Sequence, residues 1–283
     1  MCIRDSYSEK LFGIPSSQIS AEWGKRKIRV SSFRDMLKKD TKLYFDSFYY
    51  PNCGGYGAIS ETLYHRVSDK VQLETEVTGV SLNRDAGNVG RNYSCTFEAS
   101  DGKQFTRDYD VLISTLPINT FAQFFGQQLD LGFRPARLVY LNVNRADLTG
   151  MHWFYIADAA YRVNRVAEFK NFSRDHDAAD NTVICVEVTD QENFSIDNII
   201  GELERAGVLS ADDVTDSMMI DIANAYPVYD LNYADERGRA QELFSQYPGI
   251  YLLGRNAQFS HVDVDEIFSA AKKLSNELVA SLM

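Results

Sequence analysis

Apolar and polar residues alternate through the segment from residue 71 to residue 109, and this period of two predicts β-strands. The alternation is interrupted near Gly79, which is typical of a β-bulge. Asp101 and Gly102 form a turn sequence that favours a hairpin. We therefore expect an antiparallel meander whose strands occupy residues 71–82, 93–99 and 103–107.

Continuous apolar runs predict strands of a second kind. Residues 110–117 and 250–254 are short apolar runs, which are typical of parallel strands covered on both faces. The first run ends at Pro117 and the second at Gly254. We expect strands 111–114 and 250–253 to be neighbours in one buried sheet, because strands that border a ligand crevice end in this way. Further strands are predicted at residues 138–143, 153–157, 165–172 and 182–188, and an ambiguous pattern that allows a strand covers 216–225.

Helical spacing of apolar residues is clearest at Ile59, Leu63 and Val67, which repeat at i, i+4 and i+8. Asp212 and Asp213 are acidic residues of the kind that open a short helix. Helices are predicted over residues 59–67, 196–205, 234–247 and 263–282, with weaker patterns at 14–23 and 33–37. This mixture of helices, meanders and buried strands predicts an α/β plus α+β fold with interleaved domains.

The composition excludes several classes of protein. The 283 residues are 45% hydrophobic and 24% charged, which is ordinary for a folded chain and excludes general disorder. A net charge of −11 argues against a nucleic-acid binder or a polybasic membrane anchor. No apolar run approaches the length of a transmembrane helix, and no signal peptide is present. The four cysteines are scattered without a CxxC pair, so we expect no metal site and a reduced, cytoplasmic setting.

The first six residues, Met-Cys-Ile-Arg-Asp-Ser, resemble translated sequencing-adapter sequence. They are excluded from the fold prediction, and the natural N-terminus is expected to be absent. A motif that stands near the start of a natural gene product can then be missing here without being missing from its family.

Three segments could carry chemistry. Gly54, Gly55 and Tyr56 begin a glycine-rich entry to a helix, where backbone amides can approach a cofactor; the alternative is a loop that needs positive φ. The strand that ends at Gly254 leads into the helix from Asp263, whose free N–H groups favour an anion; the alternative is a packed strand and a capped helix.

The third segment is a strand that carries Arg165, whose guanidinium suits a carboxylate or phosphate. The alternative is a solvated edge strand with a surface ion pair. The aromatic turn from Tyr226 to Tyr229 is either a substrate-facing wall or a domain hinge. The sequence contains neither GxGxxG nor a Walker loop, and its four histidines form no recognisable catalytic pattern. The catalytic residues are therefore left unassigned.

Over residues 49–283, the order and spacing of these segments resemble the flavin-dependent amine-oxidase superfamily. The likeness is greatest to its protoporphyrinogen-oxidase-like and UDP-galactopyranose-mutase-like members. The resemblance implies FAD as cofactor and a small-molecule substrate. It implies cofactor contacts at Gly54, Gly55, Tyr56, Val77, Thr115, Pro117, Gly254, Arg255, Asp263 and Val264. It implies substrate contacts at Arg165, Tyr226 and Tyr229, where Arg165 opens an Arg-x-x-Glu-x-Lys strand of the mutase-like branch.

The resemblance also implies two interleaved domains. A partial FAD-binding Rossmann-like domain, without its GxGxxG unit, would comprise residues 49–118 and 249–283. An antiparallel-sheet and helical substrate-binding domain would comprise residues 7–48 and 119–248. The helix from Asp263 would direct its positive end at the N1–C2=O edge of the flavin.

The expected function is the C-terminal part of an FAD-dependent oxidoreductase of the amine-oxidase type. Such an enzyme transfers a hydride to the flavin from a C–H bond next to nitrogen or oxygen. One alternative is a mutase-like flavin-dependent isomerase of nucleotide sugars, in which Arg165 binds the diphosphate. The other is an inactive fragment that is unable to hold FAD.

Overall fold

The computed structural model describes residues 3–27, 48–83, 92–173 and 179–282. The chain forms two compact units, each built from two separate stretches of sequence. The first unit comprises Met1–Asp69 and Arg134–Leu231, and the second comprises Lys70–Phe133 and Asn232–Met283. The predicted helical pattern at residues 33–37 lies outside the described residues.

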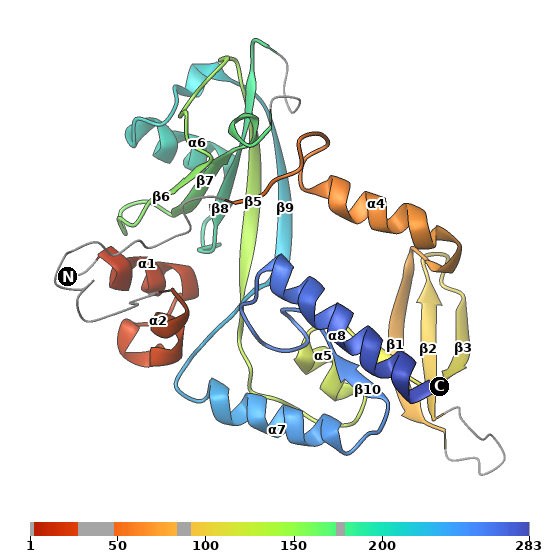
Figure 1. Ribbon diagram of the computed structural model, residues 1–283. Helices are drawn as coiled ribbons and strands as arrows, with labels where there is room; N and C mark the ends of the chain where they lie inside the picture. Colours follow the sequence, from red (N-terminus) through yellow and green to blue (C-terminus); the bar gives the residue numbers. More distant parts are fainter. Residues whose placement is uncertain (1–2, 28–47, 84–91, 174–178, 283) are drawn as a thin grey trace. The chain divides into compact units, whose positions relative to one another are not determined.

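The first unit is organised around a five-stranded sheet with the strand order β6-β7-β8-β5-β9 (Figure 1). Strands β5, β8, β7 and β6 pair antiparallel in succession. The bounds are Phe133–Val143 for β5, Trp153–Tyr155 for β6, Val163–Glu168 for β7, Thr182–Val188 for β8 and Val214–Pro227 for β9. The predicted strand at 182–188 is confirmed, and the ambiguous segment 216–225 is a strand that extends further at both ends.

One face of this sheet is covered by helix α6 (Ile196–Arg205). Ser195 caps the helix by accepting a hydrogen bond from the N–H of Asn198, and Gly207 follows its end with φ of +70°. Ile199 and Leu203 of the helix are fully buried against alternate residues of the strands. The strand residues of this core are Val139, Leu141, Val143, Val163, Val166, Ile184, Val186 and Val188.

The remaining helices among the described residues of the first unit are short. They are α1 (Ile3–Phe12), η1 (Ser16–Gln18), α2 (Ala21–Lys27), α4 (Gly57–Val67), η3 (Phe169–Asn171) and η4 (Ala211–Asp213), and η2 (Ser68–Lys70) spans the boundary between the units. Lys10 fastens α1 to the sheet, because its ammonium donates to the carbonyls of Ile156 and Val163 at 2.8 and 2.6 Å. The predicted helix at 59–67 is confirmed, but none of the residues of α4 is buried.

The second unit contains the predicted meander, β1 (Thr75–Leu82), β2 (Tyr93–Ala99) and β3 (Gln104–Tyr109). The register of β1 on β2 shifts between Val77 and Gly79, so the predicted bulge is confirmed. Strands β4 (Leu112–Ser114) and β10 (Ile250–Leu252) pair in parallel, as predicted. The helices of this unit are α5 (Ile118–Gln123), α7 (Tyr233–Ser245) and α8 (Val264–Leu282).

Two predictions about individual segments are wrong. The run 110–117 is not covered on both faces, because Ile113 of β4 is 46% exposed. The strand predicted at 165–172 ends at Glu168, whose carboxylate accepts backbone N–H groups from the loop at 148–149. The short helix predicted at Asp212 and Asp213 is present as η4, which begins one residue earlier, and both aspartates lie in its first turn.

No helix within the described ranges combines the length and apolar character that crossing a bilayer requires. The described residues also include no group of three or more His, Cys, Asp or Glu side chains that could hold a metal ion.

Candidate functional site

The face of the five-stranded sheet opposite α6 carries polar and aromatic side chains. Residues that pair directly across strands place their side chains on the same face, and Arg165 pairs with Tyr155 on one side and Glu187 on the other. The register of β7 on β8 shifts between Val163 and Arg165. As a result, the Val163 side chain lies in the core on the α6 side of the sheet, and Arg165 lies on the opposite face. By this register, the polar face comprises Leu138, Tyr140, Trp153, Tyr155, Arg165, Ala167, Cys185 and Glu187.

Arg165 and Glu187 form an ion pair at the centre of this face. Nη2 of Arg165 donates to Oε2 of Glu187 at 2.8 Å, and the side chains are 39% and 4% exposed. The hydroxyl of Tyr226 donates to Oε1 of the same carboxylate at 2.8 Å. Burial tends to lower the pKa of Arg165, but Glu187 raises it and the net pKa lies above its ordinary value. The arginine therefore stays charged, and a buried carboxylate balances its charge.

Tyrosine and cysteine side chains beside this pair are kept neutral. Burial raises the pKa of Tyr7, whose ring packs edge-on against Tyr155 with centroids 4.9 Å apart. Burial also raises the pKa of the Cys185 thiol to about 11, although Arg165 acts in the opposite direction. Neither side chain is an activated nucleophile at neutral pH. The site can orient a substrate, but these groups supply no base.

Removing Arg165 should destabilise the first unit, because Glu187 would lose its cation while remaining buried. We expect Arg165→Met to lower the free energy of unfolding by about 2 kcal/mol, since Arg165 itself is partly exposed. Arg165→Met combined with Glu187→Gln should recover most of this loss. Urea denaturation of the single and double variants measures both effects, and equal losses in the two would show that the charge of Glu187 is not the cause.

The other members of the Arg-x-x-Glu-x-Lys strand have structural positions. Glu168 is 1% exposed and accepts hydrogen bonds from the backbone of Leu148 and Thr149, from two hydroxyls and from Asn171. Burial opposes ionisation of Glu168, but the donors at Thr149, Leu148 and Thr182 hold its pKa below the ordinary value. Lys170 donates to backbone carbonyls of Ala146 and Asn181 at 2.8 and 3.0 Å.

In the second unit, the candidate residues follow the carboxyl ends of the parallel strands. Thr115 and Pro117 follow β4, and Gly254 and Arg255 follow β10. The two loops are joined where the N–H of Ile118 donates to the carbonyl of Asn256 at 3.1 Å. Gly254 has φ of +89°, and a Cβ added there would meet no atom within 4 Å. The backbone at Gly254 therefore borders open space in the described structure.

The start of α8 is capped by its own residues. The N–H of Asp263 donates to the carboxylate of Glu266 at 2.8 Å, as in a capping box. Val264 is the first residue of the helix, and its side chain is exposed. Val77 lies in β1 beside the bulge, opposite Phe97.

The remaining candidates lie in the first unit. Gly54 and Gly55 both have positive φ, as the loop interpretation predicts, and Tyr56 is the residue before α4. Tyr226 reaches the Glu187 carboxylate, whereas Tyr229 is only 1% exposed and packs against Trp23 with ring centroids 5.9 Å apart. In the structure, Arg165 and Tyr226 therefore both donate hydrogen bonds to the Glu187 carboxylate, and Tyr229 lies in the core.

Glu187, Tyr7 and Tyr155 were not found from the sequence. Glu187 had a usable signal, because it is the one carboxylate inside the apolar run Thr-Val-Ile-Cys-Val-Glu-Val. A lone acidic residue in such a strand needs a partner when it is buried. Tyr7 and Tyr155 had no comparable signal, since nothing in their local sequence places them beside Arg165.

The family model for UDP-galactopyranose mutase matches residues 2–198, which include most of the five-stranded sheet. The chain belongs to the UDP-galactopyranose mutase family. The family match and the similar solved structures place the chain in the flavin-dependent amine-oxidase-like superfamily. The resemblance inferred from the sequence is therefore confirmed. No curated protein matches the chain.

Solved structures share the fold of this mutase-family chain. A reduced UDP-galactopyranose mutase matches with a TM-score of 0.68 and 18% identity, over 90% of this chain and 58% of the other. A putative protoporphyrinogen oxidase from Exiguobacterium sp. 255-15 matches with a TM-score of 0.52 and 20% identity, over 69% and 46%. An oxidoreductase from Methanosarcina mazei matches with a TM-score of 0.51 and 16% identity, over 90% and 59%. The chain thus spans less than two thirds of the length of each.

Proposed function

We propose that this mutase-family chain is part of an FAD-dependent oxidoreductase that takes a hydride from a C–H bond next to nitrogen or oxygen. The observation that carries the choice of reaction is the ion pair of Arg165 with the buried carboxylate of Glu187. A sugar diphosphate needs uncompensated positive charge, because its phosphates carry negative charge at neutral pH. The polar face holds one guanidinium whose charge Glu187 already balances, which favours a substrate without a diphosphate.

The second unit fits part of an FAD site. Parallel strands β4 and β10 end at one edge, and ligands of α/β folds bind outside such carboxyl ends. The open space at Gly254 would admit a ring close to the backbone, and the N-terminus of α8 follows in the same unit. Thr115, Pro117, Gly254, Arg255, Asp263, Val264 and the backbone of Val77 would hold the cofactor here.

Bound FAD would supply the hydride acceptor. The positive end of α8 would favour negative charge at the edge of the flavin ring. On the polar face, Tyr226 donates to the Glu187 carboxylate, and this carboxylate holds Arg165 so that its exposed part can donate to a substrate oxygen or nitrogen. The neutral rings of Tyr7 and Tyr155 would exclude water from the substrate.

The second candidate is a flavin-dependent isomerase of nucleotide sugars, and the family match over residues 2–198 favours it. That match includes β7, the strand that carries Arg165. A diphosphate would then have to draw Arg165 away from Glu187, or be bound by cations outside the polar face.

By itself, this chain should not retain FAD tightly. Its 283 residues contain no GxGxxG, the unit that holds the ADP half of FAD in dinucleotide-binding folds. The expected result is a colourless purified chain with no flavin absorbance, and a stoichiometric yellow complex would contradict this proposal.

The experiment that separates the two reactions uses the complete gene product loaded with FAD. We expect anaerobic amines or porphyrinogens to bleach the oxidised flavin absorbance, with turnover when oxygen or a dye is admitted. UDP-galactopyranose under dithionite should give no isomerised sugar above a flavin-only control. Isomerisation without net reduction of a dye would establish the mutase reaction instead, and failure of both would refute an active flavin enzyme.

A further inference from the structure

Strand β9 forms one edge of the five-stranded sheet in the first unit, where it lies beside β5 (Figure 1). Residues 215–223 of this strand are all exposed. The large apolar residues among them are between 38% and 55% exposed, and they are Met218, Met219, Ile220 and Ile222. Among the described residues, no strand pairs with the N–H and C=O groups of β9 that point away from β5. The strand is therefore a long apolar edge with an open row of backbone hydrogen-bonding groups.

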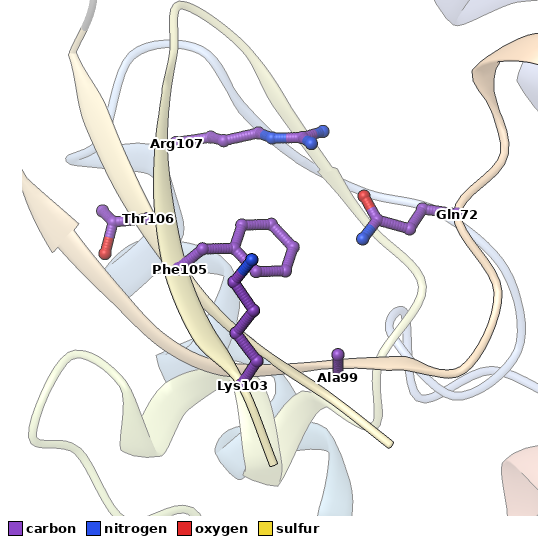
Figure 2. Close-up of a pocket in the computed structure, with 6 residues that line it drawn as sticks. All are labelled: Gln72, Ala99, Lys103, Phe105, Thr106 and Arg107. Carbon is purple, nitrogen blue, oxygen red and sulfur yellow. The ribbon is translucent and has the colours of Figure 1, made fainter. Parts of the chain in front are cut away.

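Strand β3 of the second unit shows how such an edge is normally protected. It also lies at the edge of its sheet, carries Arg107 and directly follows Lys103. Figure 2 shows these two cations on either side of Phe105, along one wall of a pocket. Charged side chains and proline at an edge oppose the approach of a further strand. In contrast, β9 contains neither lysine nor arginine, and its one proline, Pro227, is its last residue.

Contacts at two residues show which side chains of β9 share a face. Asp221 accepts a hydrogen bond from Arg137 at 2.6 Å, and Arg137 pairs with the core residue Val188 on the side of the sheet that α6 covers. Tyr226 instead reaches Glu187 on the polar face. Alternation along the strand then gives the exposed apolar residues on the side of Tyr226, which are Met218, Ile220 and Ile222.

We propose that two copies of this chain associate by antiparallel pairing of their β9 strands about a two-fold axis at Ile220. Such an axis is perpendicular to the sheet, so that directly opposed residues share a face and the two sheets become continuous. Met218 then lies opposite Ile222 of the second copy, and the two Ile220 side chains meet at the centre. The proposal requires neither the flavin nor a choice of reaction, so it is independent of the proposed function.

The acidic residues of β9 are compatible with an axis at Ile220. Asp216 lies opposite Asn224 of the second copy, whose amide can donate a hydrogen bond to the carboxylate. Asp221 lies opposite Met219 of the second copy, and Arg137 of its own chain already balances its charge. No carboxylate therefore faces another carboxylate directly across the interface.

Neighbouring registers are less favourable than this one. An axis at Met219 would place Asp216 opposite the apolar Ile222, and an axis at Asp221 would place two aspartates opposite each other, which is destabilising. Axes further from the middle of β9 pair fewer of its residues. The distribution of charge along the strand therefore selects a second copy of β9 in one register.

Analytical ultracentrifugation of the chain over a range of concentrations tests the association. We expect the parent chain to be a dimer at about 100 µM. Ile220→Lys should weaken dimerisation by about a hundredfold or more, because two ammonium groups would face each other at the centre of the interface. Leu63→Lys, at a position of similar exposure on α4 of the same unit, should change dimerisation by less than about twofold. A parent that is monomeric at about 100 µM, or equal effects of the two variants, would overturn the proposal.

Substitutions at the opposed polar pair test the register. Asn224→Asp alone should weaken dimerisation about tenfold, because it places a carboxylate opposite Asp216 of the second copy. Asn224→Asp combined with Asp216→Lys places opposite charges across the interface and should restore the affinity of the parent. A double variant that is as weak as Asn224→Asp alone would reject the axis at Ile220 and, with it, the proposal. Open-ended oligomers in place of a dimer would show that β9 pairs with a different edge, which also rejects the proposal.

Discussion

Gly254→Val should abolish FAD binding by the complete gene product if Gly254 borders the flavin. The backbone at this residue has φ of +89°, which a β-branched residue rarely adopts, and its Cβ would enter the open space at the end of β10. Strain and steric exclusion together should weaken binding by about a hundredfold or more. Flavin absorbance of the purified variant measures the result.

Gly126→Val is the matched control for this prediction. Gly126 also has positive φ, of +71°, also has open space around an added Cβ, and also lies in the second unit. It follows α5 and is not among the proposed cofactor contacts, so Gly126→Val should cost stability and still retain FAD. If Gly254→Val binds FAD at full occupancy, Gly254 is not part of the cofactor site. If both variants lose FAD equally, backbone strain and not the position of Gly254 explains the loss.

Glu168→Ala should destabilise the first unit by about 3–5 kcal/mol, the largest stability effect expected from a single substitution in this chain. The carboxylate is fully buried and accepts hydrogen bonds from Leu148, Thr149, Thr182 and Asn171. Truncation would remove the acceptor of the buried Thr182 hydroxyl and of the half-buried donors of Leu148, Thr149 and Asn171. Chemical denaturation at neutral pH measures the change in the free energy of unfolding.

Acidification should remove the stability that Glu168 contributes. Its pKa in the folded chain is lowered by the surrounding donors, so the unfolded chain binds the proton more tightly. The contribution is therefore complete above the ordinary glutamate pKa, about 4.3, and is lost as the pH falls through the lower folded value. Below about pH 4, the difference in the free energy of unfolding between Glu168→Ala and the parent should therefore become smaller. Glu61→Ala, at an exposed position of α4, should change stability by less than about 0.5 kcal/mol at any pH.

The sequence by itself determined the elements whose signals are local. The meander followed from alternation and from the Asp101-Gly102 turn, and the bulge near Gly79 followed from a break in that alternation. Helix α6 was predicted at its observed bounds, Ile196–Arg205, with Gly207 as the residue at which it stops. The pairing of β4 with β10 was also predicted, since both strands end at a residue that breaks a strand.

Tertiary structure alone decided which side chains meet. Glu168 is part of the Arg-x-x-Glu-x-Lys strand, and the loop at 148–149 supplies its hydrogen-bond donors and makes it structural. A solvated edge strand was one of the two interpretations of the Arg165 segment, but β7 lies between β6 and β8, and Arg165 pairs with Glu187. Local periodicity indicates which face of a strand a residue occupies, whereas the strand order and the register determine which residues of the adjacent strands are its neighbours. That is why the sequence pointed to Arg165 and only the fold showed the carboxylate that balances its charge.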